Sequence, residues 1–174
     1  MNARVSLLQH THGRAIPPRV GDILKRRIRQ ARFDSPAQEA MLNLLVAASH
    51  VRQLVGEACE AHGITHAQYN ALRILRGAHP DGYPRGEIAS RLVERAPDVT
   101  RLIDRLEQHG LVERTRSSDD RRLSVTRITR AGLDLLRRVD PKIDRIQKQL
   151  TARVPARDLR ELSRICERVY DDSE

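Results

Sequence analysis

Two short helical segments followed by a hairpin pattern constrain the fold of this chain most strongly. Apolar spacing predicts helices over Glu87–Val93 and Pro97–His109, and Gly110 follows the second as a left-handed cap. The stretches 111–116 and 123–129 are rich in β-prone residues and flank a polar, turn-like run. Two helices joined by a tight turn and followed by a charged hairpin predict a winged helix-turn-helix domain.

A long amphipathic helix is predicted before this domain. Ser35 can cap a helix whose first residue is a proline, and Gln38 completes a capping box. The free amides of a first helical turn need such side-chain acceptors. Apolar residues then recur every three or four positions until Gly63 ends the run. Thr65 and Gln68 repeat the capping pattern, so a second helix is expected from there to about residue 77.

Two further amphipathic helices are predicted after the hairpin. Thr129 caps the first, whose apolar residues step by 3, 4, 3 and 4 positions, a spacing typical of helix–helix seams: Leu136, Val139, Ile143, Ile146 and Leu150. The last helix, Pro155–Tyr170, carries another apolar stripe. The terminal helices hold more apolar surface than a small domain covers, so a second copy of the chain is expected to cover it.

The expected fold class is mostly α with a small β-hairpin wing, a winged helix-turn-helix domain flanked by N- and C-terminal dimerisation helices. Residues 1–34 are interpreted as a basic, mobile arm and residues 35–63 as the N-terminal dimerisation helix. The DNA-binding domain is placed at residues 64–130 and the C-terminal dimerisation helices at residues 131–174.

The charge of the chain favours a polyanionic partner. The 174 residues carry 32 Lys and Arg against 23 Asp and Glu, a net charge of +9. The excess is uneven, because residues 1–35 hold eight basic and two acidic side chains and a second excess lies in residues 84–130. We hypothesise that the arm contacts phosphates that flank the bound DNA site.

The remaining composition argues against several classes of protein. Two cysteines make no disulfide framework, and no apolar run approaches the length of a membrane span, so a cytoplasmic protein is expected. The sequence contains no glycine-rich phosphate loop, nucleophile elbow or ordered set of metal ligands. We therefore expect no enzyme activity, no cofactor, no metal and no membrane partner.

Three parts of the sequence together resemble the MarR family of bacterial transcriptional regulators. They are the run from Asp98 to Val112, the motif Asp120-Arg121-Arg122 and the run Ile128-Thr129-Arg130-Ala131-Gly132. The resemblance covers about residues 36–172 and implies a homodimer joined through its first and last helices. Each subunit would place one helix in the major groove and its wing in the minor groove of a pseudo-palindromic operator. Repression is the favoured mode, with release by a small aromatic or phenolic effector.

Four residues of the second short helix are candidates for the major groove. Thr100 can donate or accept at a base edge, and Arg101 can form a forked pair with guanine. Asp98 would compensate the helix dipole or accept from a cytosine amine. Arg105 lies one turn beyond Arg101, where a phosphate contact competes with an ion pair to an acidic neighbour such as Asp104 or Glu94.

The hairpin tip supplies the candidate wing contacts. The resemblance places Arg122 in the minor groove, with Asp120 orienting the Arg122 side chain. The narrow groove concentrates negative potential, so a guanidinium held there binds favourably. Arg121 is expected at a phosphate. A solvated charged surface is the alternative for any single arginine.

His50, Tyr69 and Arg73 could present an imidazole, a hydroxyl and a cation to an anionic aromatic ligand in a mostly aliphatic pocket. Ordinary packing and solvation explain these three residues equally well. Cys59 and Cys166 lie on apolar stripes and are expected in the core rather than at a redox sensor.

Cys59, His62 and His66 carry zinc-ligand atoms, but their spacing favours an exposed loop or capping role for the histidines over a zinc site. Two other classes of function remain as alternatives. One is an architectural DNA-binding protein with little sequence preference, and the other is a winged helix that binds only proteins.

Overall fold

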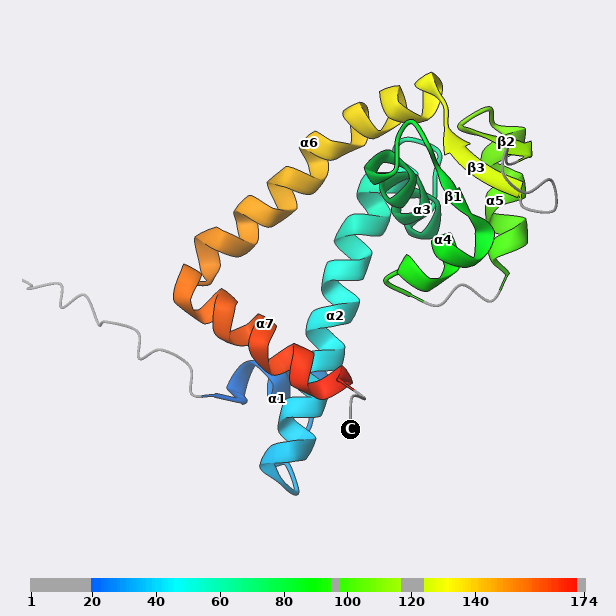
Figure 1. Cartoon of the computed structure of the whole chain (residues 1–174). Helices are drawn as coiled ribbons and strands as arrows, with labels where there is room; N and C mark the ends of the chain where they lie inside the picture. Colours follow the sequence, from blue (N-terminus) through cyan, green and yellow to red (C-terminus); the bar gives the residue numbers. More distant parts are fainter. Residues whose placement is uncertain (1–19, 95–97, 117–123, 172–174) are drawn as a thin grey trace, which may run out of the picture. The chain divides into compact units, whose positions relative to one another are not determined.

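The computed structural model describes residues 20–94, 98–116 and 124–171. The chain divides into two compact units, Met1–Ala48 and Ser49–Glu174. In chain order, the described elements are α1 (Asp22–Ile28), α2 (Pro36–Glu60), α3 (His66–Gly77), β1 (Tyr83–Pro84), α4 (Arg85–Arg91), α5 (Val99–Gln108), β2 (Val112–Arg116), β3 (Ser124–Ile128), α6 (Arg130–Arg153) and α7 (Ala156–Tyr170) (Figure 1).

The first unit contains α1 and the first half of α2. The Ser35 hydroxyl accepts a hydrogen bond from the Gln38 amide at 3.1 Å, as the capping pattern predicts. The Gln38 side chain accepts from the Asp34 amide at 2.7 Å, one residue earlier than a standard capping box would place the bond. Leu24 of α1 is buried, and Gly21, just before the helix, lies against Phe33 and Glu39 of the same unit.

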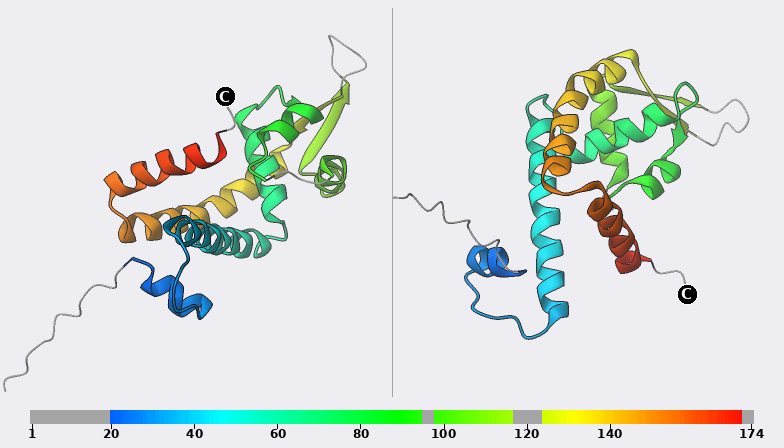
Figure 2. Two further views of the ribbon diagram at one scale, coloured as in Figure 1. Left: turned by 90° about the horizontal axis from the view of Figure 1, so that it is seen from below. Right: turned by 90° about the vertical axis from the view of Figure 1, so that its left-hand side faces the viewer.

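The core of the second unit lies where α3, α4, α5 and the sheet meet one end of α6 (Figure 1). Thr65 caps α3 with the reciprocal bonds to Gln68 that the sequence predicts. The apolar faces of α3, α4 and α5 then bury Leu72, Ile88 and Leu106 completely. Figure 2 shows the three helices gathered beside the sheet in both of its views.

The hairpin forms as predicted and gains a third strand. β2 and β3 pair antiparallel, with Val112 opposite Ile128. β1 joins the other edge of β3, with Tyr83 opposite Thr126, so the strand order is β1-β3-β2. This two-residue strand was not expected, because a Tyr-Pro dipeptide carries no alternating pattern and Pro cannot donate to a ladder.

The start of α6 fits closely against the sheet. Thr129 caps the helix by accepting from the Gly132 amide at 3.2 Å. Gly132 is buried, and an added Cβ would lie 2.7 Å from the Ile128 Cγ1 atom and closer still to the Leu111 carbonyl oxygen. Only a residue without a side chain fits this crossing of α6 and the hairpin.

The predicted seam of α6 divides between two surroundings. Leu136 and Val139 are fully buried in the core of the second unit, so the expectation that they serve association rather than core burial is wrong for them. The physical reason is that the first turns of α6 cover α3 and β3. Ile146 is half-buried and Leu150 is 42% exposed, so only this later part of the seam remains open.

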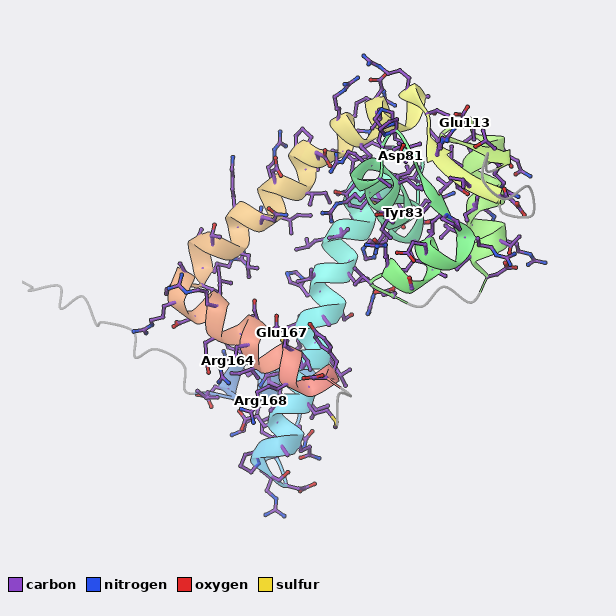
Figure 3. All side chains as sticks on the ribbon, in the orientation of Figure 1. Asp81, Tyr83, Glu113, Arg164, Glu167 and Arg168 are labelled. Carbon is purple, nitrogen blue, oxygen red and sulfur yellow. The ribbon has the colours of Figure 1, made fainter. Side chains whose placement is uncertain are left out.

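Apolar side chains are exposed on two helices for which association was predicted. On α2 these are Met41, Leu44, Leu45 and Val51, and on α7 they are Leu162, Ile165, Val169 and Tyr170. α7 has no buried residue, and its polar side includes Arg164, Glu167 and Arg168 (Figure 3). In the described ranges, no helix is both long and apolar enough to cross a membrane.

Candidate nucleic-acid interface

The N-terminus of α5 is built by Asp98. Its Oδ1 atom accepts a hydrogen bond from the Arg101 amide at 2.9 Å, which makes Asp98 the N-cap of the helix. Its Oδ2 atom lies 3.4 Å from Arg101 Nε. Of the two roles predicted for Asp98, the structure therefore shows the helix-terminal one. The sequence signal was an Asp directly before the first apolar position of α5.

The outer face of α5 is polar and open. Leu102, Ile103 and Leu106 face the core, which leaves Thr100, Arg101 and Arg105 exposed on the opposite side. The Arg101 side chain is 79% exposed despite its contact with Asp98. The structure thus brings three of the predicted major-groove residues to one accessible helix face.

Arg105 is not neutralised by the acidic neighbours that were weighed against a phosphate contact. Asp104 pairs with Arg114 instead, and Glu94 pairs with Arg52 at 2.6 Å. Among the described residues, Arg105 has no carboxylate partner. Its charge is therefore available to an external anion.

Sequence reasoning missed Arg85, the first residue of α4. Its Nη1 atom donates to the Thr100 hydroxyl oxygen at 3.0 Å, so α4 and the start of α5 are joined at the exposed face. The Thr100 hydroxyl keeps its own proton for a further acceptor. A Pro directly before a helical pattern marked this position as a helix start, but the contact with Thr100 depends on tertiary packing.

Arg114 was also missed, and it fastens the wing to α5. Its guanidinium lies against the carboxylates of Asp104 and Glu107, with 3.3 Å between Nε and Glu107 Oε2. The two acids lie on α5 and Arg114 on β2, so the root of the hairpin is held against the helix. The predicted wing residues Asp120, Arg121 and Arg122 lie outside the described residues.

The three candidate ligand residues line one cavity in the second unit. His50, Tyr69 and Arg73 border a space of about 420 Å³. His66 and Arg153, which were not predicted as ligand residues, also line it. The rest of the wall is mainly aliphatic, as expected: Val51, Leu54, Val55, Ile143, Ile146 and Leu150, with the polar Gln147 and Gln149.

Tyr69 differs from its predicted role because its hydroxyl already has an acceptor. The hydroxyl donates to Asp140 Oδ1 at 3.3 Å, and Arg76 holds the other Asp140 oxygen at 2.5 Å. Burial, together with the Asp140 charge, raises the pKa of Tyr69 to about 12. While it donates to Asp140, the hydroxyl can offer a ligand only its lone pairs.

Arg73 is an available cation of the cavity. Its guanidinium carbon lies 5.8 Å from the centre of the Tyr69 ring, within the range of a cation–π contact. It is exposed and forms no ion pair with a described residue. Arg153, which also lines the cavity, is likewise exposed and forms no ion pair with a described residue. An aliphatic wall with two such guanidiniums suits a small apolar anion.

The MarR family model matches residues 64–124. The chain is 30% identical to the HTH-type transcriptional regulator PrsX of Escherichia coli over 123 residues, which are 68% of this chain and 74% of that protein. It is 40% identical to a MarR transcription factor from Planctomyces limnophilus, whose crystal structure matches with a TM-score of 0.60 over 78% of this chain and 98% of that one. The chain belongs to the MarR family.

A third MarR-type relative is the homoprotocatechuate degradative operon repressor of Escherichia coli. It is 27% identical over 121 residues, which are 70% of this chain and 78% of that protein. The relatives are transcriptional regulators, and the winged-helix fold predicted from the sequence is confirmed.

The cysteines of this MarR-family chain have different surroundings. Cys59 is fully buried in the core, as predicted, and burial with the nearby Glu60 charge raises its thiol pKa to about 11. Cys166 is only half-buried on the open face of α7, so its predicted place in the core is wrong for the single chain. The reason is that α7 buries none of its residues against the described part of the chain.

The histidines do not gather with Cys59 into a metal site. Among the described residues, no three His, Cys, Asp or Glu side chains are grouped as metal ligands would be. His66 lines the cavity, and the buried Nε2 atom of His62 has no hydrogen-bond partner in the described part of the chain. His62 lies in the turn after α2, as the loop interpretation expects, but it is half-buried rather than exposed.

Proposed function

We propose that this MarR-family protein is a sequence-specific repressor that binds a pseudo-palindromic operator as a homodimer. The observation that carries the proposal is the outer face of α5, where Arg101 and Arg105 are exposed while the inner face is locked into the core. A helix held in this way can enter the major groove with its polar side forward. Arg101 would read guanine, and Arg105 would contact phosphate or an adjacent base.

The wing completes the DNA contact in this proposal. Arg122 would enter the minor groove with Asp120 orienting it, and Arg121 would lie at a phosphate. Arg114 supports this arrangement from the root of the hairpin, because its contacts with Asp104 and Glu107 fix β2 relative to α5. A protein that acts on chromosomal DNA in this way would work in the bacterial cytoplasm.

A second copy of the chain would cover the exposed apolar residues of the terminal helices. Val169 and Tyr170 of α7 are 65% and 69% exposed, and Leu162 and Ile165 are each 47% exposed. Such a row is unusual on a monomer and typical of an association surface. A two-fold dimer would set the two α5 helices about 34 Å apart, one turn of duplex DNA.

We propose further that a small aromatic or phenolic anion binds the cavity beside Arg73 and releases the DNA. The cavity is bordered by α2, α3 and α6, and the Tyr69–Asp140–Arg76 contacts join α3 to α6 beneath it. A ligand that preferred a different spacing of these helices would shift the population of DNA-binding geometries. The name of one relative, the homoprotocatechuate degradative operon repressor, contains a phenolic acid, which is consistent with an effector of this class.

The test is a titration of the DNA fragment upstream of the protein's own gene with scrambled competitor. Arg101→Ala and Arg122→Ala should each weaken specific binding by about 1–3 kcal/mol. Arg138→Ala is the matched control, because Arg138 is exposed on α6 and has no ion pair among the described residues. Equal affinity for operator and scrambled DNA in the wild type would favour the architectural alternative.

A further inference from the structure

α1 and the residues just after it, in the first unit, carry a dense cluster of positive charge. α1 begins after Gly21, which has a φ of 88°, a conformation that glycine adopts readily. The side chain of Leu24 in this helix is only 3% exposed. An added Cβ on Gly21 would lie 3.3 Å from the Phe33 ring and closer to the Glu39 carboxylate, so the helix start sits against both. The side chains of α1 are therefore held on a packed element rather than on a loose arm.

Four arginines of this element face solvent. Arg26 and Arg27 are exposed on α1, and Arg29 and Arg32 are exposed just after it. We call these four residues the basic patch. Among the described residues, none of the four has a carboxylate partner. Lys25 is excluded from the patch because its ammonium lies over the Phe33 ring at 5.7 Å.

The basic patch contrasts with the arginines of the second unit, many of which are paired within the chain. Arg52, Arg76 and Arg91 each hold a carboxylate within 2.6 Å. Arg114 holds two carboxylates. A group of neighbouring guanidiniums left without counter-charge repels itself, and an external polyanion relieves that repulsion.

Arg29 adds an independent sign that charge matters at this position. It has a φ of 56° and a ψ of 40°, the left-handed conformation at the end of α1, which favours glycine or asparagine. A guanidinium is thus carried at a backbone position where a glycine would be more stable. This is the pattern expected where a side chain serves a contact rather than the fold.

We propose that the basic patch binds the phosphate backbone of duplex DNA outside the operator half-site. This inference rests on the proposed function, because the same chain must first hold the operator and so raise the local concentration of flanking DNA. The contacts would add affinity without reading bases. Guanidiniums suit phosphates well, since they offer forked donors and keep their charge at all physiological pH values.

An anionic membrane surface fits the same charge less well. α1 buries Leu24, and the exposed large apolar residues here are Ile23 in the helix and Val20 just before it. A helix of seven residues with its apolar side turned inward has little to insert between lipids. The test therefore also measures binding of the protein to phosphatidylserine vesicles.

The test compares a variant in which Arg26, Arg27, Arg29 and Arg32 are changed to Gln with a control of equal charge. The control changes four α6 cations that have no ion pair among the described residues: Arg138, Lys142, Arg145 and Lys148. Binding is measured at several salt concentrations on the operator with long flanks and on the operator trimmed to its half-sites. The readout is the slope of log K against log salt.

For the patch variant we expect the slope on the long duplex to fall by about 0.9 for each arginine that had contacted a phosphate. On the trimmed duplex, the variant and the wild type should have the same slope. An unchanged slope on the long duplex, an equal loss in the control variant, or an equal loss on the trimmed duplex would each overturn the proposal. So would binding of the patch to phosphatidylserine vesicles in place of flanking DNA.

The variant Arg29→Gly distinguishes loss of the Arg29 charge from an effect on the stability of the fold. It should leave the melting temperature unchanged or raised, while the slope falls by about 0.9 per chain on the long duplex. A lowered melting temperature with an unchanged slope would contradict both the strain and the contact. Failure of the proposed function is distinguishable, because wild-type protein would then bind operator and scrambled DNA alike whatever the flank length.

Discussion

Gly132→Ala tests the packing that joins the wing to α6. The new methyl group would lie 2.7 Å from Ile128 Cγ1 and closer to the Leu111 carbonyl oxygen. That oxygen accepts the Thr129 amide at 3.0 Å, so backbone must move and this bond must weaken. Overpacking costs about 1–3 kcal/mol, and loss of the bond adds about 1 kcal/mol. The higher helix propensity of Ala offsets about 1 kcal/mol of this cost, so the free energy of unfolding should fall by about 1–3 kcal/mol in total.

The assay is urea unfolding followed by circular dichroism, with Gly86→Ala as the matched control. Gly86 lies in the first turn of α4, and no described atom lies within 4 Å of its added Cβ. The control should gain about 0.5–1 kcal/mol, because Ala loses less backbone freedom on folding than Gly. If both variants gained stability, the close approach of α6 to the hairpin would be refuted.

Three further predictions concern single side chains. The raised pKa of Tyr69 means that the unfolded chain loses this proton first, so stability should fall as the pH rises from 10 to about 12, and Tyr69→Phe should flatten that fall in urea titrations. If the wild type and the Phe variant fell equally, Tyr69 would not be the group responsible. With Cys166→Ser, the remaining Cys59 should resist a disulfide reagent in native buffer at pH 8 and react fully in guanidinium, because burial raises its pKa to about 11. Rapid native reaction would show that the thiol is accessible. Thr65→Ala should lower the unfolding free energy by about 1 kcal/mol, since the cap of α3 is lost, and an unchanged urea midpoint would argue against the cap.

Local signals predicted most of the helix boundaries and the hairpin. Thr65 and Thr129 cap their helices as their sequence patterns indicate, and Gly110 has the left-handed φ of 67° expected after a helix. These features depend on a few neighbouring residues, so the sequence displays them directly. The outer face of α5 was predictable for the same reason, because the 3.6-residue period separates its exposed arginines from its apolar side.

Contacts between residues far apart in the sequence could not be predicted in this way. β1 exists because Tyr83 meets Thr126, and the Tyr69 hydroxyl is occupied because Asp140 arrives from another helix. The apolar spacing of α6 also could not distinguish a core residue such as Leu136 from the half-open Ile146. Periodicity gives the face of a helix, but the tertiary fold decides what covers that face.

Recognition of a specific two-fold DNA sequence by this protein is tested most directly by selecting bound sequences from a random duplex library with the full chain. We expect enrichment of an inverted repeat whose half-sites lie about 10 base pairs apart. Arg101→Ala should lose that enrichment, and Arg138→Ala should keep it. Recovery of DNA without any enriched sequence, or of a single half-site without symmetry, would contradict such recognition.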